Sequence, residues 1–420
     1  MQQARMAPIG AAARIASMDV LRGLALLGIF LVNVAWFTAP LVGHAEGIDL
    51  ELQGPALWLD VAIYVFASSK FWTLFSLLFG MGFAVMQARA EASGLPFTGL
   101  YLRRTSGLLL IGGLHACLVW SGDILVAYAL TAFALLLLFR RAPTTGLWAW
   151  GIALYMSIVV LLMLVALLLG LLGDAAAPDD AARRAAETLA LRQQEVAAYS
   201  RGSYLDATHM RLRFQQAYFF NSLFLLPMTL GLFVFGTWLV RRGVLARPAE
   251  HRRLLHAMAW AIGPLGLAVT LLGIAIDPRP DLEGPGSVGA LWASSLHMAG
   301  GAMMTLGYLG IVVLVLERGP GGLRVLAPAG RMALTLYLMQ SLVGTWVFYG
   351  HGLGLWGQVG RVGQVVLVLS VFAAQLAFAH LWMARFRHGP VEWLWRAFTY
   401  LEWPPLRRSP PTPPPLPPNP

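Results

Sequence analysis

The chain has very little of what a water-soluble protein needs. Only 12% of its 420 residues are charged, which is about half the share of an average soluble domain. Hydrophobic residues make up 58% of the chain, and its mean hydropathy is +0.67. This composition cannot supply the polar surface that would coat a soluble globule, so it excludes that class and indicates a membrane protein.

Cysteine and lysine each occur once, as Cys117 and Lys70. A single cysteine excludes an internal disulfide, and the net charge of +10 comes almost wholly from arginine. These arginines flank apolar runs instead of gathering on one soluble face, so we expect no nucleic-acid binding. No metal site is expected either, because no two histidines are four residues apart. No GxxxxGK[ST] or GxGxxG motif follows a strand, and we interpret the glycine-rich run 350–357 as a turn.

About ten apolar stretches are each nearly long enough to cross a bilayer. They cover residues 19–39, 71–88, 103–120, 124–139, 146–172, 217–240, 254–276, 289–316, 332–349 and 362–384. The first stretch continues to Trp36, which is too long for a cleavable signal peptide, so we expect it to stay as a spanning helix. The sequence predicts an all-α polytopic transmembrane bundle. The arginine distribution predicts that both chain termini are cytoplasmic.

The remaining segments define the expected organisation of the chain. We predict a cytoplasmic N-terminal segment (1–18), a transmembrane domain (19–400) and a proline-rich cytoplasmic tail (401–420). The extramembrane loop 174–215 is alanine-rich with charges at helical spacings, which fits an amphipathic outer helix or a solvated connector. The short apolar segment 56–69 indicates an interfacial or re-entrant helix.

Polar residues inside the spans are candidate functional residues, because hydrocarbon makes them costly. Arg22 and Asn33 are eleven residues apart, so they share one helix face about 16 Å apart, and Asp19 lies one turn before Arg22. His115 lies in the outer third of its span, and Asp123 caps the next helix, where a carboxylate could orient an imidazole. A membrane anchor and core hydrogen bonds are the plainer interpretation of these residues.

Lys70 begins the second span at its outer end, where positive residues are disfavoured. Its ammonium either snorkels to the interface or pairs with Asp123, which lies at the same depth. By depth alone, Asn33, Lys70, His115 and Asp123 share the outer third of the membrane. The sequence does not show whether they meet laterally.

A second polar set lies at the inner surface. Arg331 begins the ninth span, Gln340 follows within it, and Glu392 comes after the tenth span. Arginines and tryptophans at helix ends are common belt residues. The sharper hypothesis is a cationic mouth for a phosphate-bearing ligand, with Arg22 and Arg331 as its floor.

Four segments of the chain, in this order, resemble the YeiB-like family of bacterial multi-pass membrane proteins (domain of unknown function 418). They are MDVLRGLALLGIFLVN, KFWTLFSLLFGMGF, GGLHACLVWSGDILVAYAL and GRMALTLYLMQS with the closing RHGPVEWLWR. The resemblance covers the chain from Asp19 to about Arg396. It implies membership of a family with no assigned chemistry and a location in the bacterial plasma (inner) membrane.

The first span is also distantly similar to two groups of membrane acyltransferases, the acyltransferase-3 proteins and the heparan glucosaminide N-acetyltransferase-like proteins. Arg22 matches an arginine of the first group, but position 33 is asparagine where that group has a histidine. In the second group an LRG…VN pattern precedes an outer-loop histidine, and His44 lies at a compatible distance. Both resemblances imply an acyl-coenzyme A donor, such as acetyl-coenzyme A, presented from the cytoplasm to an acceptor on the outer side.

These observations give the hypothesis of a membrane acyltransferase. Asp19, Arg22 and Arg331 would bind the acyl donor, and His115 with Asp123 would deprotonate the acceptor, with His44 as the rival base. Asn33 or Lys70 would stabilise the developing oxyanion.

We further expect Lys70, Gln340 and Glu392 to contact substrate. The expected partners are membrane lipid and a small-molecule, glycan or lipid acceptor. The oligomeric state stays open, a homodimer included.

Two other classes of function remain open from the sequence. A proton-coupled transporter or a flippase for lipids or small molecules would use His115, Asp123 and Lys70 as a proton relay without covalent chemistry. A scaffold or assembly subunit would use none of these residues chemically.

Overall fold

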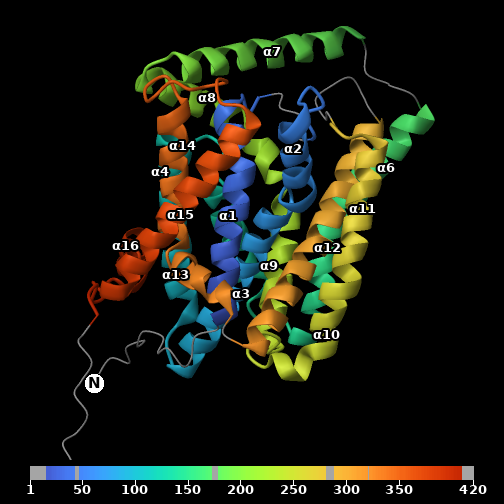
Figure 1. Cartoon of the computed structure of the whole chain (residues 1–420). Coiled ribbons are helices and arrows are strands. Elements are labelled where there is room, and N and C mark those ends of the chain that lie inside the picture. Colours follow the sequence, from blue (N-terminus) through green and yellow to red (C-terminus); the bar gives the residue numbers. More distant parts are fainter. Residues whose placement is uncertain (1–15, 43–46, 173–177, 281–287, 320, 409–420) are drawn as a thin grey trace, which may run out of the picture.

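The chain forms a bundle of long helices with one helix lying across an end of it (Figure 1). The computed structural model describes residues 16–42, 47–172, 178–280, 288–319 and 321–408. Within these ranges there is no strand, only an isolated bridge between Phe386 and Arg407. The all-α helix bundle predicted from the sequence is therefore confirmed.

The structure contains helices of very different lengths. In chain order they are α1 (Ala16–Thr38), α2 (Gly54–Phe66), α3 (Lys70–Ala92), α4 (Phe97–Leu118), α5 (Leu125–Phe139), α6 (Thr144–Leu172), α7 (Pro178–Ser200), α8 (Tyr204–Leu223), α9 (Leu226–Arg241), α10 (Arg252–Ala257), a π-helical turn (Met258–Ile262), α11 (Gly263–Ile276), α12 (Val288–Arg318), α13 (Ala327–Arg331), α14 (Ala333–Phe348), α15 (Arg361–Arg385) and α16 (Pro390–Tyr400). Short 3₁₀ turns at Pro248–His251 and Gly322–Leu326 precede α10 and α13.

The membrane character of the chain is confirmed by its apolar helices. Among the described residues, six helical segments are long and apolar enough to cross a membrane, and α5, α9 and α14 are shorter apolar helices. The structure thus gives fewer full-length spans than the ten apolar stretches of the sequence. One reason is that the predicted span 217–240 is divided between α8 and α9 just before Pro227, a residue that fits the first turn of a helix but not its interior.

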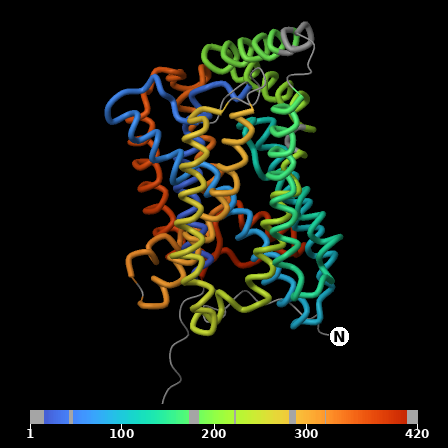
Figure 2. Tube along the Cα trace, turned by 90° about the vertical axis from the view of Figure 1, so that its right-hand side faces the viewer, coloured from blue at the N-terminus to red at the C-terminus, as the bar shows by residue number. Residues whose placement is uncertain are grey.

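α7 lies across one end of the bundle, and α1 begins at the opposite end (Figures 1 and 2). We call these the α7 end and the α1 end. Buried Glu195 of α7 accepts hydrogen bonds from the amides of Leu41 (3.0 Å) and Val42 (2.9 Å), which follow α1. The Tyr199 carbonyl accepts from the Gly350 amide at 2.7 Å. The helix expected within 174–215 is therefore present and is docked onto two loops of the bundle.

Burial makes the docking of α7 sensitive to pH. Burial raises the pKa of Glu195 to about 6, against the opposing effect of its two amide hydrogen bonds. A carboxyl whose pKa is higher in the docked state stabilises docking below its free pKa of about 4.5, and this contribution is lost as pH rises through 6. We expect hydrogen exchange of the Leu41 and Val42 amides, corrected for intrinsic rates, to be slower at pH 5 than at pH 7.5. Glu195→Gln should flatten the difference, and an unchanged difference in that variant would contradict the assignment.

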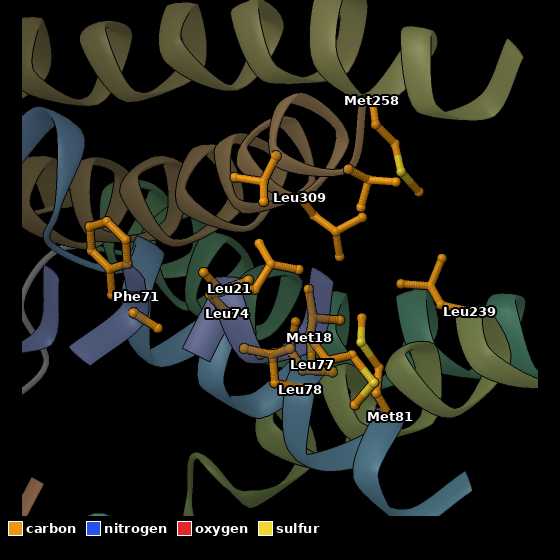
Figure 3. Close-up of a cluster of buried hydrophobic side chains, with 14 of the residues drawn as sticks. Met18, Leu21, Phe71, Leu74, Leu77, Leu78, Met81, Leu239, Met258 and Leu309 are labelled. Atoms are coloured by element: carbon orange, nitrogen blue, oxygen red, sulfur yellow. The ribbon is translucent and has the colours of Figure 1, made fainter. Parts of the chain in front are cut away.

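The bundle is held by an apolar core to which several helices contribute (Figure 3). Met18 and Leu21 of α1 pack with Leu77 of α3, Met258 of the π-helical turn and Leu309 of α12, all 5% exposed or less. The side chains come from segments far apart in the sequence, so this cluster fixes α3 beside α1 and α12. α3 in turn contributes one wall of the cavity described below.

Glycines let α3 and α9 approach closely, and Gly80 tests this contact. A Cβ atom at Gly80 would overlap the backbone of Phe233 in α9, whereas a Cβ at Gly113 of α4 would meet no atom within 4 Å. We expect Gly80→Ala to destabilise the protein by about 1–3 kcal/mol through overpacking, and Gly113→Ala to leave the melting temperature in detergent unchanged or slightly higher. Equal melting temperatures for the two variants would contradict this packing.

Candidate ligand cavity and the buried histidine–aspartate pair

An elongated cavity of about 330 Å³ extends along the bundle from the beginning of α1. Its walls come from α1, α3, α4, α5, α13, α14 and α16. On α3 the lining residues extend from Phe75 to Arg89, which corresponds to about 21 Å along the helix axis. The shape suits a long ligand with one polar end better than a compact one.

Arginines dominate the end of the cavity nearest the start of α1. The charged residues that line the cavity are Arg22, Arg89, Arg104, Arg331, Arg387 and Arg396 together with Asp19 and Glu392, and His388 adds a titratable ring. Arg22 and Arg396 both act electrostatically on Arg104, so the guanidinium groups form one cluster. This cluster, which we call the arginine mouth, has a formal excess of positive charge and attracts anions.

Arg22 is held in place by its own helix. Its Nη1 donates to Asp19 Oδ1 at 3.1 Å, one turn earlier in α1. Across the cavity, a Cβ atom at Gly82 of α3 would lie 3.8 Å from Arg22 Nη2. The missing side chain at Gly82 therefore leaves space beside the guanidinium. α13 packs tightly on α1 at Gly330 and so brings Arg331 to the same mouth.

α16 closes one side of the mouth through Trp395. The Arg104 guanidinium lies 3.7 Å from the centre of the Trp395 ring, and Trp395 Nε1 donates to the Arg104 carbonyl at 2.7 Å. An arginine stacked on an aromatic ring keeps its N–H edges available for an anion. The tryptophans and arginines of α16 are therefore not only belt residues.

Glu392 joins α16 to the beginning of α14. Its Oε1 accepts from the amides of Leu334 (2.7 Å) and Thr335 (3.0 Å), and its Oε2 accepts from the Thr335 hydroxyl. A carboxylate at a helix N-terminus satisfies amides that have no partner within the helix. The structure thus places Glu392 at the cavity wall with its oxygens used for helix capping.

The capping contact predicts a structural role for Glu392. Glu392→Gln replaces the oxygen that accepts from Thr335 by a donor, so we expect a loss of about 1–3 kcal/mol of stability. Glu187→Gln on the exposed face of α7 is the matched control, and its melting temperature should equal that of the wild type. A melting temperature of Glu392→Gln equal to that of this control would argue against the capping role.

His115 and Asp123 form a buried pair just beyond the end of the cavity that lies away from the arginine mouth. His115 Nδ1 lies 2.6 Å from Asp123 Oδ2, and both side chains are at most 2% exposed. Asp123 Oδ1 accepts from the Val126 amide at 2.9 Å, which fixes the carboxylate at the start of α5. His115 Nε2 has no hydrogen-bond partner among the described residues. With Nδ1–H donated to the carboxylate, Nε2 keeps a lone pair for a substrate.

Tyr337 of α14 separates this pair from the cavity. Its ring centre lies 5.4 Å from that of His115, and Asp123 acts on it electrostatically. Tyr337 and Ile124, the residue after Asp123, both line the cavity. Tyr337 therefore lies next to both the cavity and the His115–Asp123 pair.

The other candidate residues lie elsewhere. Lys70 donates to the Tyr64 carbonyl at 3.2 Å, and the Asp123 carboxylate contacts His115 and the Val126 amide, so these contacts do not support the alternative in which Lys70 pairs with Asp123. The physical reason is that equal depth does not place two helices side by side. Gln340 donates to Gln375 Oε1 at 3.1 Å, between α14 and α15, and is not among the cavity-lining residues.

Asn33 and His44 are the two remaining candidates from the sequence. Asn33 is half-buried and lies eleven residues after Arg22, on the face of α1 that includes cavity-lining Ile29, but it is itself not in the cavity wall. His44 lies outside the described residues.

Sequence reasoning missed several residues that the structure brings into the cavity. The sequence indicates Arg89 and Arg104 only as orientation signals at helix ends, and it does not single out Tyr101 and Tyr128. A signal was present in RHGPVEWLWR, where two arginines, a histidine and a glutamate lie within ten residues at the start of a short amphipathic helix. The helix was not expected to fold back beside α4.

Fold and site together define the chain as a helical membrane protein with an arginine-lined cavity leading toward a buried histidine–aspartate pair. Residues 239–402 match the family described as "Protein of unknown function (DUF418)". The chain is 33% identical over 414 residues to the uncharacterized protein YxaH of Bacillus subtilis, covering 94% of this chain and 96% of that one. It is 30% identical over 402 residues to the uncharacterized protein YeiB of Escherichia coli, covering 91% and 95% of the two chains. The chain belongs to the DUF418 family, as the resemblance to YeiB-like proteins predicted.

Proposed function

We propose that this protein is an acyltransferase of the bacterial plasma membrane that moves an acyl group from a cytoplasmic acyl-coenzyme A-like donor to an acceptor on the outer side. In this arrangement the α1 end faces the cytoplasm and the α7 end faces outward. The observation that carries the proposal is the common axis of three features. The arginine mouth, the elongated cavity and the His115–Asp123 pair follow one another along the bundle.

The arginine mouth suits the phosphates of the donor. Arg22, Arg104 and Arg331 come from three different helices and line one end of the cavity. Guanidinium groups bind phosphate oxygens bidentately, and a cluster of them raises the local concentration of an anion. The apolar and aromatic wall beyond the mouth would hold the pantetheine arm and the acyl group and would exclude water.

His115 is the general base of the proposed reaction. Its Nε2 takes the proton from an acceptor hydroxyl or amine as that oxygen or nitrogen attacks the thioester carbonyl. The tetrahedral oxyanion then collapses, the carbon–sulfur bond breaks, and the imidazolium returns the proton to the thiolate. Asp123 keeps the imidazole in the required tautomer and stabilises its positive charge.

Asn33 keeps its proposed role as an oxyanion donor, because its helix face continues from the cavity toward the α7 end. The amide of an asparagine can donate to an oxyanion where charge develops. Lys70 does not share that role in our proposal, since its ammonium donates to the Tyr64 carbonyl between α2 and α3.

One observation favours a proton-coupled transporter as the second candidate. His297 of α12 is 4% exposed, stacks on Tyr64 at 4.2 Å, and has no hydrogen-bond partner at either ring nitrogen among the described residues. Acyl transfer would not use this histidine, whereas a proton relay would need titratable groups inside the membrane.

An experiment on the purified full-length protein distinguishes acyl transfer from proton-coupled transport. Acetyl-coenzyme A binding is measured by calorimetry in detergent, and proton uptake is measured in proteoliposomes that contain no acyl donor. We expect micromolar to millimolar binding and slow donor hydrolysis, because water can replace the missing acceptor. Proton movement without any binding of acyl-coenzyme A would instead favour the transporter.

A further inference from the structure

Arg211 of α8 is a buried arginine at the α7 end, and it has no role in the proposed acyl transfer. It is 1% exposed. Its Nη1 donates to the Leu118 carbonyl (2.9 Å) and to Thr208 Oγ1 (3.0 Å), whereas Nε and Nη2 have no hydrogen-bond partner among the described residues. Nε–H and one N–H of Nη2 point the same way from one edge of the guanidinium. This edge can hold both oxygens of a carboxylate or a phosphate.

No counter-ion for Arg211 occurs in the described part of the chain. Glu195 lies near Arg211, because both side chains act electrostatically on Tyr199 and Tyr349. The Glu195 oxygens, however, accept from the Leu41 and Val42 amides. A buried charge without a partner costs several kcal/mol, so a protein that keeps one has a use for it. An anion from outside the chain would remove this cost.

The surroundings of Arg211 add a further donor. Trp120 Nε1 is buried without a hydrogen-bond partner and can only donate. Trp120 packs in the same cluster as Tyr199 and Tyr349, which stack on each other at 4.5 Å. Arg211 itself lies over the Tyr204 ring at 5.2 Å. The cluster thus offers unused N–H groups between aromatic walls, which is the environment of an anionic group attached to a larger molecule.

The position of Arg211 relates it to the catalytic histidine. Its hydrogen bond to the Leu118 carbonyl places it three residues beyond His115 along α4, about 4.5 Å further toward the α7 end. The cavity lies on the other side of His115, toward the α1 end. Arg211 and the arginine mouth therefore approach His115 from opposite ends of the bundle.

We propose that Arg211 binds the carboxylate or phosphate group of the acceptor, and so positions the acceptor hydroxyl or amine at His115. The role of the bound molecule as acceptor rests on the proposed acyl transfer, whereas the binding of an oxyanion at Arg211 does not. α7 covers the cluster through Tyr199 and Glu195, so the acceptor enters when α7 shifts. Acceptors without an anionic group would lose this contact.

The binding is tested with the full-length protein in detergent and in nanodiscs. The probes are inorganic phosphate, glucuronate, and phosphatidylcholine nanodiscs with or without phosphatidylglycerol, with thermal stabilisation as the readout. The variants are Arg211→Gln, Arg211→Lys and, as the matched control, Arg213→Gln, since Arg213 is exposed and donates only to Gln194 in the described residues. We expect saturable stabilisation of the wild type and the Arg213 control. Arg211→Gln should abolish it, and Arg211→Lys should weaken the affinity about tenfold or more, because a lysine lacks the planar fork.

Stabilisation by phosphate or glucuronate assigns a soluble acidic acceptor, and stabilisation only by phosphatidylglycerol assigns a lipid headgroup. No stabilisation of the wild type by any probe, or equal affinities in Arg211→Lys and the wild type, overturns the proposal. Coenzyme A binding is measured in parallel. If the Arg211 variants lose anion binding but still bind coenzyme A, both sites are supported. If the wild type binds the anion but not coenzyme A, the Arg211 site is supported and the proposed acyl donor is excluded.

Discussion

Replacing His115 by asparagine is expected to lower the rate of acyl transfer by about 10²- to 10⁴-fold, the contribution of a general base. The described residues give the His115 ring one hydrogen bond, from Nδ1 to Asp123. The amide nitrogen of asparagine can replace Nδ1 in it, so expression, melting temperature and donor affinity should remain close to those of the wild type. The measurement is transfer from labelled acetyl-coenzyme A to an acceptor fraction from the source membrane. His256→Asn, an exposed histidine of α10, is the control. Transfer by His115→Asn at the wild-type rate would remove this residue from the mechanism.

Asp123 allows a second measurement of the same chemistry. Asp123→Asn keeps an oxygen for the Val126 amide but loses the negative charge beside the imidazole. We expect a loss of rate similar in size to that of His115→Asn, because the amide nitrogen that replaces Oδ2 would donate to Nδ1 and leave Nε2 protonated. Transfer by Asp123→Asn at the wild-type rate would contradict this role for Asp123.

Removing charge from the arginine mouth is expected to weaken donor binding strongly. Arg22→Gln and Arg331→Gln should each raise the dissociation constant of coenzyme A by about 10- to 100-fold, since a hydrogen bond between charged groups contributes about 1.5–3 kcal/mol. The effect should appear in the Michaelis constant for the donor more than in the turnover number, and calorimetry with coenzyme A measures it directly.

The control for the mouth is Arg253→Gln, an exposed arginine at the same end of the bundle. Its affinity should equal that of the wild type, and the wild-type affinity should fall as salt rises. Equal losses in Arg22→Gln and Arg253→Gln would mean that general surface charge, and not the mouth, attracts the donor.

The helices were predictable from the sequence because each apolar run has its own length and flanks. The same holds for local contacts: Asp123 follows His115 closely enough for a helix end and a cap to bring the two together. The Asp19–Arg22 pair, three residues apart on α1, is of this kind as well. Periodicity fixes the depth and the face of a residue within its own helix.

Lateral placement in the bundle was not predictable. Lys70 and Asp123 share a depth, yet Lys70 begins α3 beside α2 and α12, where the Thr305 hydroxyl donates to its carbonyl. Arg104 and Trp395 are separated by almost three hundred residues and still stack. Such contacts depend on how helices with similar apolar surfaces pack against one another, and a single sequence carries almost no signal for that choice.

The central claim is that one long ligand reaches from the arginine mouth to His115. Its most direct test is the structure of the protein with a non-hydrolysable acyl-coenzyme A analogue in nanodiscs. Our account predicts phosphates against Arg22, Arg104 and Arg331 and the acyl carbonyl within hydrogen-bond reach of the His115 side chain, with Tyr337 rotated aside. Density for the analogue at the α7 end, or phosphates away from these arginines, would contradict it.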